Sequence, residues 1–225
     1  MLEGDGNMTE SAPRLRADAR RNREQVITAA REVFIEQGTE ASLEEIARRA
    51  GVGIATLYRR FPDRGALIRA VVLDNMAVIT EELEAAEKEE PDAESVLVRL
   101  LRVVVRRRIG ALVLLLLPSL HEDPTTHEQV RAARASAIRR LRPLLRAAQR
   151  EGRLRGDITI TDIALGLVKL SRPLPMIAAR LNDAATERQL ELFIDSLRAS
   201  SADGTGLRGK PALDADPNDV LGPPL

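Results

Sequence analysis

The chain of 225 residues has no cysteine, no tryptophan and only two histidines. Without cysteine it cannot form a disulfide, a thiolate metal site or a cysteine nucleophile. The two histidines, His121 and His127, flank Glu122, Asp123 and Pro124, and a metal site would need at least one further ligand in a fixed geometry. We therefore expect a solvated loop here, and neither a metal nor a cofactor.

Aromatic residues are also scarce, at 2% of the chain: Phe34, Tyr58, Phe61 and Phe193. Strands are usually rich in aromatic and β-branched side chains, whereas alanine, leucine, arginine and glutamate favour helices. Because these four residue types are abundant here, the composition predicts an all-α protein.

Charge of neither sign is in excess, since 34 basic residues balance 34 acidic ones. This balance excludes a uniformly basic protein that coats nucleic acid, although it allows a local basic face. The longest apolar run, residues 109–117, is far shorter than the roughly 20 residues that cross a bilayer. Residues 1–23 also lack the apolar segment of a secretory signal. We expect a cytoplasmic protein with no membrane partner.

The two ends of the chain lack apolar periodicity. Residues 1–13 are polar with scattered glycine, and residues 201–225 are rich in glycine and proline. Such segments cannot bury enough apolar surface to fold, so we expect a disordered leader and a flexible tail. Between them the pattern is helical, with longer helices predicted near residues 64–90, 92–117, 125–151, 160–180 and 184–199. The helix at 160–180 should be interrupted by Pro173 and Pro175.

Two short helices lie close to the N-terminus, after a longer one that ends near Gly38. Ser42 and Glu45 have the spacing of a capping box, in which each side chain bonds the other residue's backbone N–H. This box predicts a helix over 43–50. Gly51 and Gly53, which follow it, end this helix before a second helix begins at 54–61.

Two such helices joined by a tight glycine turn form a helix-turn-helix, whose second helix can lie in the major groove of DNA. Leu57 and Phe61 are four residues apart and should anchor this second helix to the core. The outward residues are then Ala55, Thr56, Arg59 and Arg60. Residues 14–69 hold twelve arginines and eight acidic residues, a local net charge of +4 that has the sign expected for DNA binding.

The string from Ser42 to Ile68 resembles the DNA-binding domain of the tetracycline-repressor (TetR) family of transcriptional regulators. Its most specific part is Gly51-Val-Gly-Ile-Ala-Thr-Leu-Tyr58, followed by Phe61-Pro-Asp-Arg64 and Leu67. Residues 131–166 are similar to the regulatory domain of SbtR-like members. The resemblance implies a three-helix DNA-binding domain at 14–63. It also implies a connecting helix with a helical ligand-binding and dimerisation domain at 64–200, and repression relieved by a small molecule.

The resemblance also implies which residues touch DNA: Ser42, Ala55, Thr56, Tyr58, Arg59, Arg60 and Arg64. Tyr58 would give its hydroxyl to a phosphate, the alternative being a ring that packs on the core with a wet edge. Ser42 is foremost a helix cap. At Gly53 and Ile54, where the family often has polar residues, we expect no contact. The arginines of residues 14–23 form either a minor-groove arm or a solvated, flexible segment.

The C-terminal half has one aromatic residue, Phe193, so a pocket there cannot stack a flat aromatic ligand between several rings. We expect a cavity lined by Leu, Val, Ile and Met from the helices at 92–117, 125–151 and 160–180. An aliphatic or small amphipathic effector suits such a cavity, and an empty or vestigial pocket is the alternative. The sequence alone assigns no ligand-binding residue.

The last two predicted helices carry more apolar residues than a single buried stripe needs, which favours contact with a second copy. These residues are Ile163, Leu167, Leu170, Leu174 and Ile177, then Leu190, Phe193, Ile194 and Leu197. A twofold dimer would present its two DNA-reading helices roughly 34 Å apart, which predicts a palindromic site on double-stranded DNA.

Two other function classes compete with a DNA-binding regulator. An enzyme is disfavoured because the sequence has no nucleophile–base pair, glycine-rich phosphate loop or metal spacing. A helical adaptor that uses its helix-turn-helix on protein alone would bind without the steep salt dependence of DNA contacts.

Overall fold

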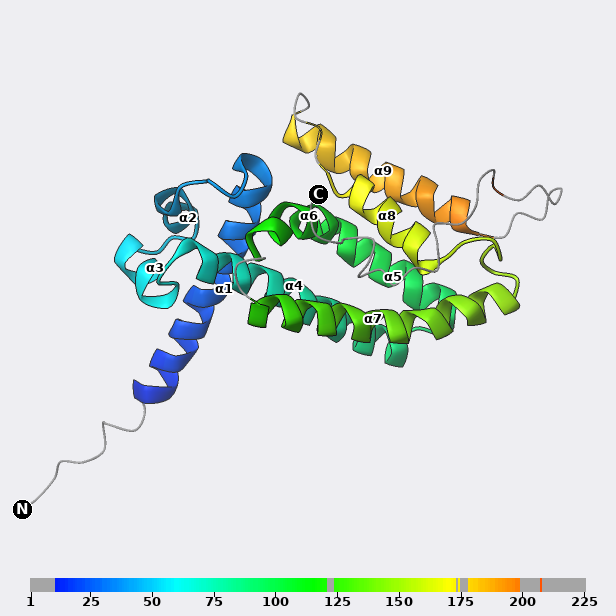
Figure 1. Ribbon diagram of the computed structural model, residues 1–225, viewed down its shortest axis with the longest axis horizontal. Helices are drawn as coiled ribbons and strands as arrows, with labels where there is room; N and C mark the ends of the chain where they lie inside the picture. The colour runs from blue at the N-terminus through cyan, green and yellow to red at the C-terminus, as the bar shows by residue number, and fades with distance from the viewer. Residues whose placement is uncertain (1–10, 121–123, 173, 175–177, 199–206, 208–225) are drawn as a thin grey trace, which may run out of the picture. The chain divides into compact units, whose positions relative to one another are not determined.

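The computed structural model describes residues 11–120, 124–172, 174, 178–198 and 207 (Figure 1). Their secondary structure is helical without a named strand, as the composition predicts, apart from an isolated bridge between Leu154 and Arg198. The chain divides into two compact units, Met1–Val71 and Val72–Leu225. Its described helices are α1 (Ser11–Gln37), α2 (Leu43–Arg49), α3 (Ile54–Arg60), α4 (Arg64–Glu89), α5 (Ala93–Arg106), α6 (Ile109–Leu120), α7 (Pro124–Arg150), α8 (Ile160–Leu170) and α9 (Ala179–Leu197).

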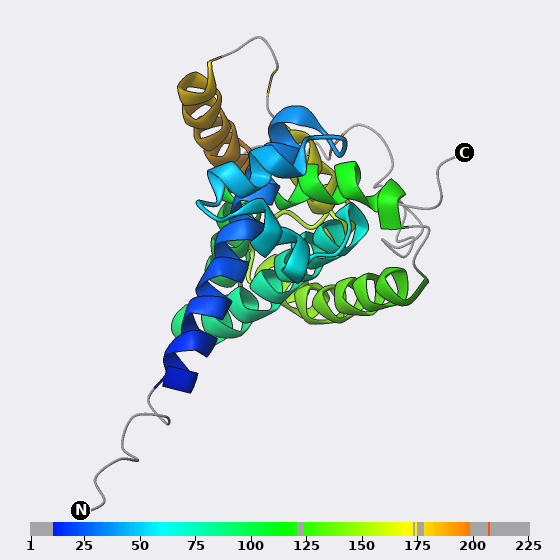
Figure 2. The ribbon, with the colours of Figure 1, turned by 90° about the vertical axis from the view of Figure 1, so that its left-hand side faces the viewer.

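The first unit is built on the C-terminal half of α1. Figures 1 and 2 show α2 and α3 gathered at this half, while the N-terminal turns of α1 extend beyond them. The apolar residues of α1 recur at helical spacing and are fully buried: Val26, Ile27, Ala30, Val33 and Phe34. Gly38 ends the helix in a left-handed conformation with φ +86°, and its N–H donates to the carbonyl of Phe34. This packing fixes the platform on which α3 sits.

The N-terminal arginines do not lie on an extended arm. Residues 14–23 belong to α1, and Arg20 lies within 3.6 Å of Glu24 one turn later. The prediction of a flexible segment is therefore wrong for this stretch, and the expected leader is three residues too long, because α1 begins at Ser11. The rest of the expected leader, residues 1–10, and the expected tail, residues 201–225 apart from Leu207, lie outside the described residues.

The second unit contains one break that the sequence pattern missed. The predicted helix at 92–117 is two helices, because Arg107 ends α5 and Arg108 takes a left-handed conformation with φ +51° before α6 begins. No glycine or proline marks this turn. The Arg108 guanidinium donates to Asp183 of α9, and α6 approaches α8 closely at Gly110, so tertiary contacts set the new direction.

The last two helices have different bounds from the predicted ones. The predicted helix at 160–180 ends at Leu170, and α9 begins at Ala179 rather than at residue 184. A capping box starts α8: the Asp162 N–H donates to Thr159 Oγ1, and the Thr159 N–H donates to Asp162 Oδ2 at 2.8 Å. Pro173 and Pro175, which were expected to interrupt the helix, lie outside the described residues, as does His121. The loop expected at His127 is wrong, because α7 begins at Pro124 and His127 is an exposed residue of that helix.

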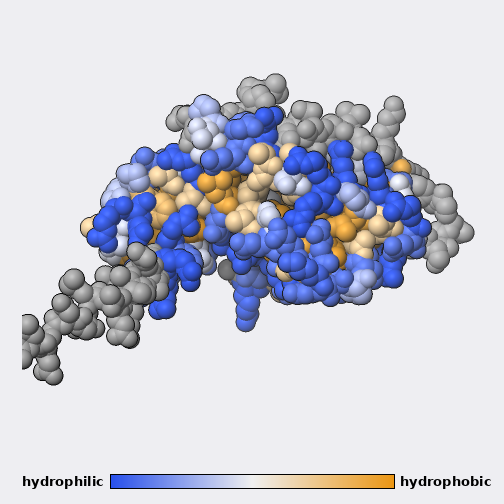
Figure 3. Space-filling view, turned by 90° about the horizontal axis from the view of Figure 1, so that it is seen from below, coloured by the Kyte–Doolittle hydropathy of each residue, from blue (hydrophilic) through white to orange (hydrophobic). Residues whose placement is uncertain are grey.

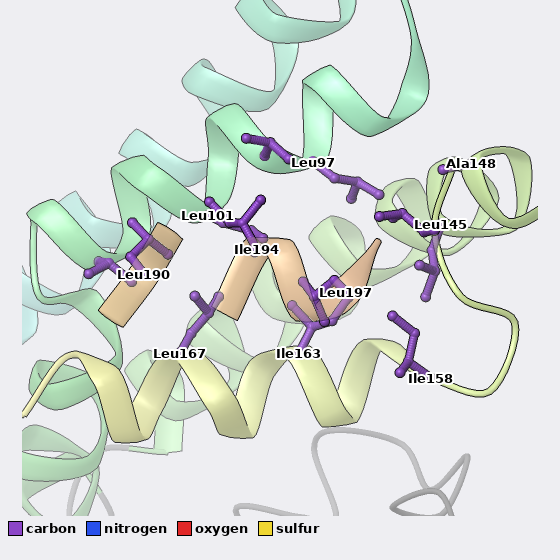
Figure 4. Packing of buried hydrophobic residues seen from close by; sticks show 13 residues of the cluster. Leu97, Leu101, Leu145, Ala148, Ile158, Ile163, Leu167, Leu190, Ile194 and Leu197 are labelled. Carbon is purple, nitrogen blue, oxygen red and sulfur yellow. The ribbon is translucent and has the colours of Figure 1, made fainter. Parts of the chain in front are cut away.

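The core of the second unit uses the apolar residues that were assigned to a dimer face. Figure 4 shows side chains of α5, α7, α8 and α9 pointing toward one another. Ile163, Leu167, Leu190, Ile194 and Leu197 are all buried in this cluster within the single chain. For these five residues the prediction of contact with a second copy is wrong, because helices of their own unit already bury them. Leu174, which belonged to the same prediction, is 56% exposed and stays a prediction. Leu170 and Phe193 pack against the same cluster, and Ile177 lies outside the described residues.

None of the described helices combines the length and the apolar character that spanning a bilayer requires. In the view of Figure 3, hydrophilic side chains cover most of the visible face, and hydrophobic ones show only in patches between them.

Gly110 is predicted to resist substitution although it lies in a helix, where replacing glycine by alanine usually gains about 1 kcal/mol. A Cβ there would lie 2.9 Å from the Cα of Val168, which is backbone of α8 and cannot turn away. We expect Gly110→Ala to lower the free energy of unfolding by about 1–3 kcal/mol in denaturant titrations. Gly156→Ala in the same unit, whose Cβ would meet no atom within 4 Å, is the control. Equal stability of the two variants would contradict this prediction.

Candidate nucleic-acid interface

The turn between α2 and α3 positions the exposed helix of the first unit. The Gly51 N–H donates to the carbonyl of Arg48, and the Val52 N–H donates to that of Ala47 at 3.0 Å. Gly51 has φ +67°, a left-handed conformation that a side chain would strain. The chain therefore reverses within a few residues and starts α3 at Ile54.

Helix α3 has one buried side and one open side. Leu57 is fully buried and Phe61 nearly so, which confirms both as the anchors of this helix. Opposite Leu57 lie Ala55 and Arg59, which are four residues apart and exposed. Tyr58 is 46% exposed, so its ring is only partly packed on the core. The open side therefore combines a small side chain, a cation and an aromatic hydroxyl.

The remaining residues of α3 complete this surface. Arg60 is exposed, as predicted, whereas Thr56, which was also predicted to face outward, is only half-buried. Ile54 was not expected to contact DNA, yet it is 36% exposed at the start of α3. Its position follows from the same rotation of about 100° per residue that places Tyr58, one turn later, beside it.

The arginines of α2 and α3 differ in their partners. Arg48 and Arg49 both donate to the Glu45 carboxylate, and these bonds lower the Glu45 pKa to about 2. Arg49 also donates to Glu36 of α1, so the α2 cations stabilise the packing of the unit. Among the described residues, neither Arg59 nor Arg60 has an acidic partner. The cations of α3 are the ones available to an anionic ligand.

Ser42 caps α2 as predicted, but the capping box is only half formed. The Glu45 N–H donates to Ser42 Oγ at 3.3 Å, and the Ser42 hydroxyl donates to the Glu44 carboxylate at 2.7 Å. Glu45 does not return the bond, because its carboxylate is taken by Arg48 and Arg49. The hydroxyl of Ser42 thus already serves the helix that it starts.

Arg64 has a structural contact that the sequence did not reveal. One nitrogen of its guanidinium, Nη1, donates to the carbonyls of both Thr39 and Ala41, in the loop between α1 and α2. Asp63 caps the same end of α4 by accepting from the Ala66 N–H at 2.6 Å. Arg64 therefore ties this loop to the start of α4, with its other N–H groups left for a further ligand.

The second unit contains an apolar cavity of about 200 Å³. The three regions expected to form it all contribute, and α4 and α9 contribute as well, through Met76 and Ile79 and through Ile194 and Leu197. Arg134 of α7 is the one charged residue among the described residues that line it. The apolar lining confirms the predicted character of the pocket, whereas Arg134 was not foreseen, because no motif marks a single arginine on a helix rich in them.

Comparisons with known proteins place both units in one family. Residues 26–71 match the family model of bacterial regulatory proteins of the tetR family, and residues 92–199 match the C-terminal domain of SbtR-like transcriptional regulators. A TetR transcriptional regulator from Streptomyces coelicolor is 33% identical, with a TM-score of 0.55 over 80% of this chain and 99% of that one. This chain belongs to the TetR family of transcriptional regulators. The resemblance stated from the sequence is thereby confirmed for both regions.

Two further relatives agree with the TetR-family assignment. A TetR transcription regulatory protein from Mycobacterium vanbaalenii is 31% identical, with a TM-score of 0.55 over 82% of this chain and 99% of that one. An HTH-type transcriptional regulator from Staphylococcus aureus is 39% identical over 59 residues, which are 26% of this chain. The match spans only 32% of that curated regulator's length. The N-terminal unit of this TetR-family chain is thus a helix-turn-helix DNA-binding domain.

Proposed function

We propose that this TetR-family protein is a homodimeric repressor that binds a palindromic DNA operator through α3 and is released from it by an aliphatic or small amphipathic effector. The observation that carries the proposal is the open side of α3, a helix anchored by Leu57. Arg59 and Arg60 are exposed there and have no acidic partner within the part of the chain that the structure describes. Arginines that are available in this way on an anchored helix suit phosphates and base edges.

Each residue of this surface has a proposed role. Ala55, opposite the anchor, lets the backbone of α3 come close to the base edges, and Arg59 and Arg60 reach base edges or phosphates. Thr56 contacts a base edge or a phosphate. Tyr58 offers its exposed hydroxyl to a phosphate. Ser42 and Arg64, besides holding α2 and its preceding loop, contact the phosphate backbone at the rim, where only positioning is needed.

The homodimer is proposed to use the exposed side of α9. Leu181 and Leu192 are 59% and 48% exposed. They are eleven residues apart, which places both on one side of the helix, since eleven steps of 100° differ from three full turns by only about 20°. A twofold contact through this side would present two copies of α3 to DNA, which accounts for a palindromic operator.

The effector is proposed to act through α4. This helix begins at Arg64, beside the DNA-binding elements, and its residues Met76 and Ile79 line the cavity. A ligand in the cavity therefore touches the helix that leaves the DNA-binding unit. Release from DNA requires that the ligand bind one arrangement of α4 more tightly than the other.

Selection of bound sequences from random duplex DNA by the purified full-length protein tests the proposal. We expect a palindromic consensus and an affinity that falls steeply as the salt concentration rises, because arginine–phosphate contacts release counterions. Recovery of no consensus, or binding that does not respond to salt, would contradict DNA recognition through α3. It would favour an adaptor that contacts protein alone.

A further inference from the structure

The cavity of the second unit has a chemical polarity along α7. Four α7 residues line it: Arg134, Ala137, Ile138 and Leu141. They recur at spacings of three and four and therefore lie on one side of the helix, over a length of about 10 Å. Arg134 at one end is cationic and half-buried, whereas Leu141 at the other end packs against the closed core around Leu97 and Leu101. The other described residues that form the walls are apolar.

We propose that the cavity binds a straight-chain monocarboxylate, with the carboxylate on the Arg134 guanidinium and the alkyl chain along the apolar wall. This inference rests on the proposed role of the cavity as the effector site, and it names the class of the effector. An unbranched chain suits walls contributed by aliphatic residues of six helices, and a single cation at one end suits one anionic head group.

The chemistry of Arg134 favours an anion over a neutral polar head. A guanidinium has five N–H donors and matches a carboxylate with two parallel hydrogen bonds. Arg134 already takes part in an interaction of its own, so a bound carboxylate would share the five N–H donors of the guanidinium with it. Covering a cation with a purely apolar ligand would remove water from it without any compensating bond. A hydrocarbon without a head group is therefore a poorer fit.

The size of the cavity limits the chain length. An apolar cavity of about 150 Å³ accommodates benzene, which has six carbons. The same space per carbon in the cavity of about 200 Å³ gives a chain of roughly eight carbons. Small residues on two helices, Ala137 and Ala164, keep this space open. The expected ligand is thus of medium length.

Calorimetric titration of sodium octanoate into the full-length protein tests the proposal. We expect binding at one site per chain, about tenfold or more weakened in Arg134→Met, which keeps an unbranched apolar stem and removes the guanidinium with its charge. Arg146→Met is the matched control, because Arg146 lies on the same helix, is exposed and does not line the cavity. Octanamide, which is uncharged, should bind the wild-type protein about tenfold more weakly than octanoate, and this comparison holds even if Arg134→Met fails to fold.

Equal octanoate affinity in the wild type and in folded Arg134→Met, or equal affinity for octanoate and octanamide, would overturn the proposal. So would an absence of octanoate binding. Operator binding measured on the same samples separates the two proposals. Intact operator binding without octanoate binding would overturn the proposed ligand class and leave the proposed DNA binding unaffected. If octanoate binding depends on Arg134 but the protein selects no DNA sequence, the proposed repressor function is overturned and the proposed ligand class is kept.

Discussion

Replacing Arg59 and Arg60 together by alanine is expected to weaken operator binding about 100-fold, and more if both side chains reach base edges. Each good arginine contact to a base or phosphate contributes roughly 1–3 kcal/mol, and these two side chains project from the open side of α3 without acidic partners among the described residues. Because neither pairs with an acidic group of the described chain, the unfolding transition should stay where it is. Gel shifts over a range of salt concentrations, together with thermal melting, measure both effects.

The matched control is the pair Arg146→Ala and Arg150→Ala in α7. Both arginines are exposed and lack acidic partners within the described chain, so this pair removes the same charge from the other unit. The control should leave the dependence of affinity on salt nearly unchanged, whereas the α3 pair should lower its slope by about one for each arginine that no longer reaches a phosphate. An equal loss of affinity in both pairs would mean that overall charge, and not the surface of α3, drives binding.

The local signals of the first unit could be predicted from the sequence. The Ser42 cap, the left-handed turn at Gly51 and the Asp63 cap depend on the residue itself and on neighbours within three or four positions. The burial of Leu57 and Phe61 follows from helical periodicity in the same way. The positions of α2 and α3 along the chain could therefore be predicted from the sequence, and so could the side of α3 on which its predicted DNA-contacting residues lie.

Features that depend on distant parts of the chain were not predictable. Arg64 donates to carbonyls 23 and 25 residues earlier, and Arg108 donates to Asp183, 75 residues later. The apolar residues of α8 and α9 were assigned to a dimer because periodicity reports that a side chain is buried and not what buries it. Arg134 was missed for a related reason, since only the packing of six helices brings it to a cavity.

The substitution Leu57→Ala is expected to have the largest effect on stability. Leu57 has no exposed surface, and a buried leucine truncated to alanine typically costs about 2–5 kcal/mol in the free energy of unfolding. The unit Met1–Val71 is small, and small domains are only marginally stable, so this loss removes much of its stability. We expect an early unfolding transition of the first unit, seen by hydrogen exchange at the amides of α1–α3, with the core of the second unit still protected.

Tyr58→Ala, at the neighbouring position, is the comparison that separates a loss of stability from a loss of DNA contact. Tyr58 follows Leu57 directly but is 46% exposed, so its removal should change stability little while weakening operator binding about tenfold, because the hydroxyl can no longer donate to a phosphate. Leu57→Ala should lose operator binding only in proportion to the unfolded fraction, so a stabilising osmolyte should restore the binding. The same osmolyte should not restore operator binding in Tyr58→Ala. If Leu57→Ala left hydrogen exchange unchanged, α3 would not be held by its buried side, and the assignment of its opposite side to DNA would lose its basis.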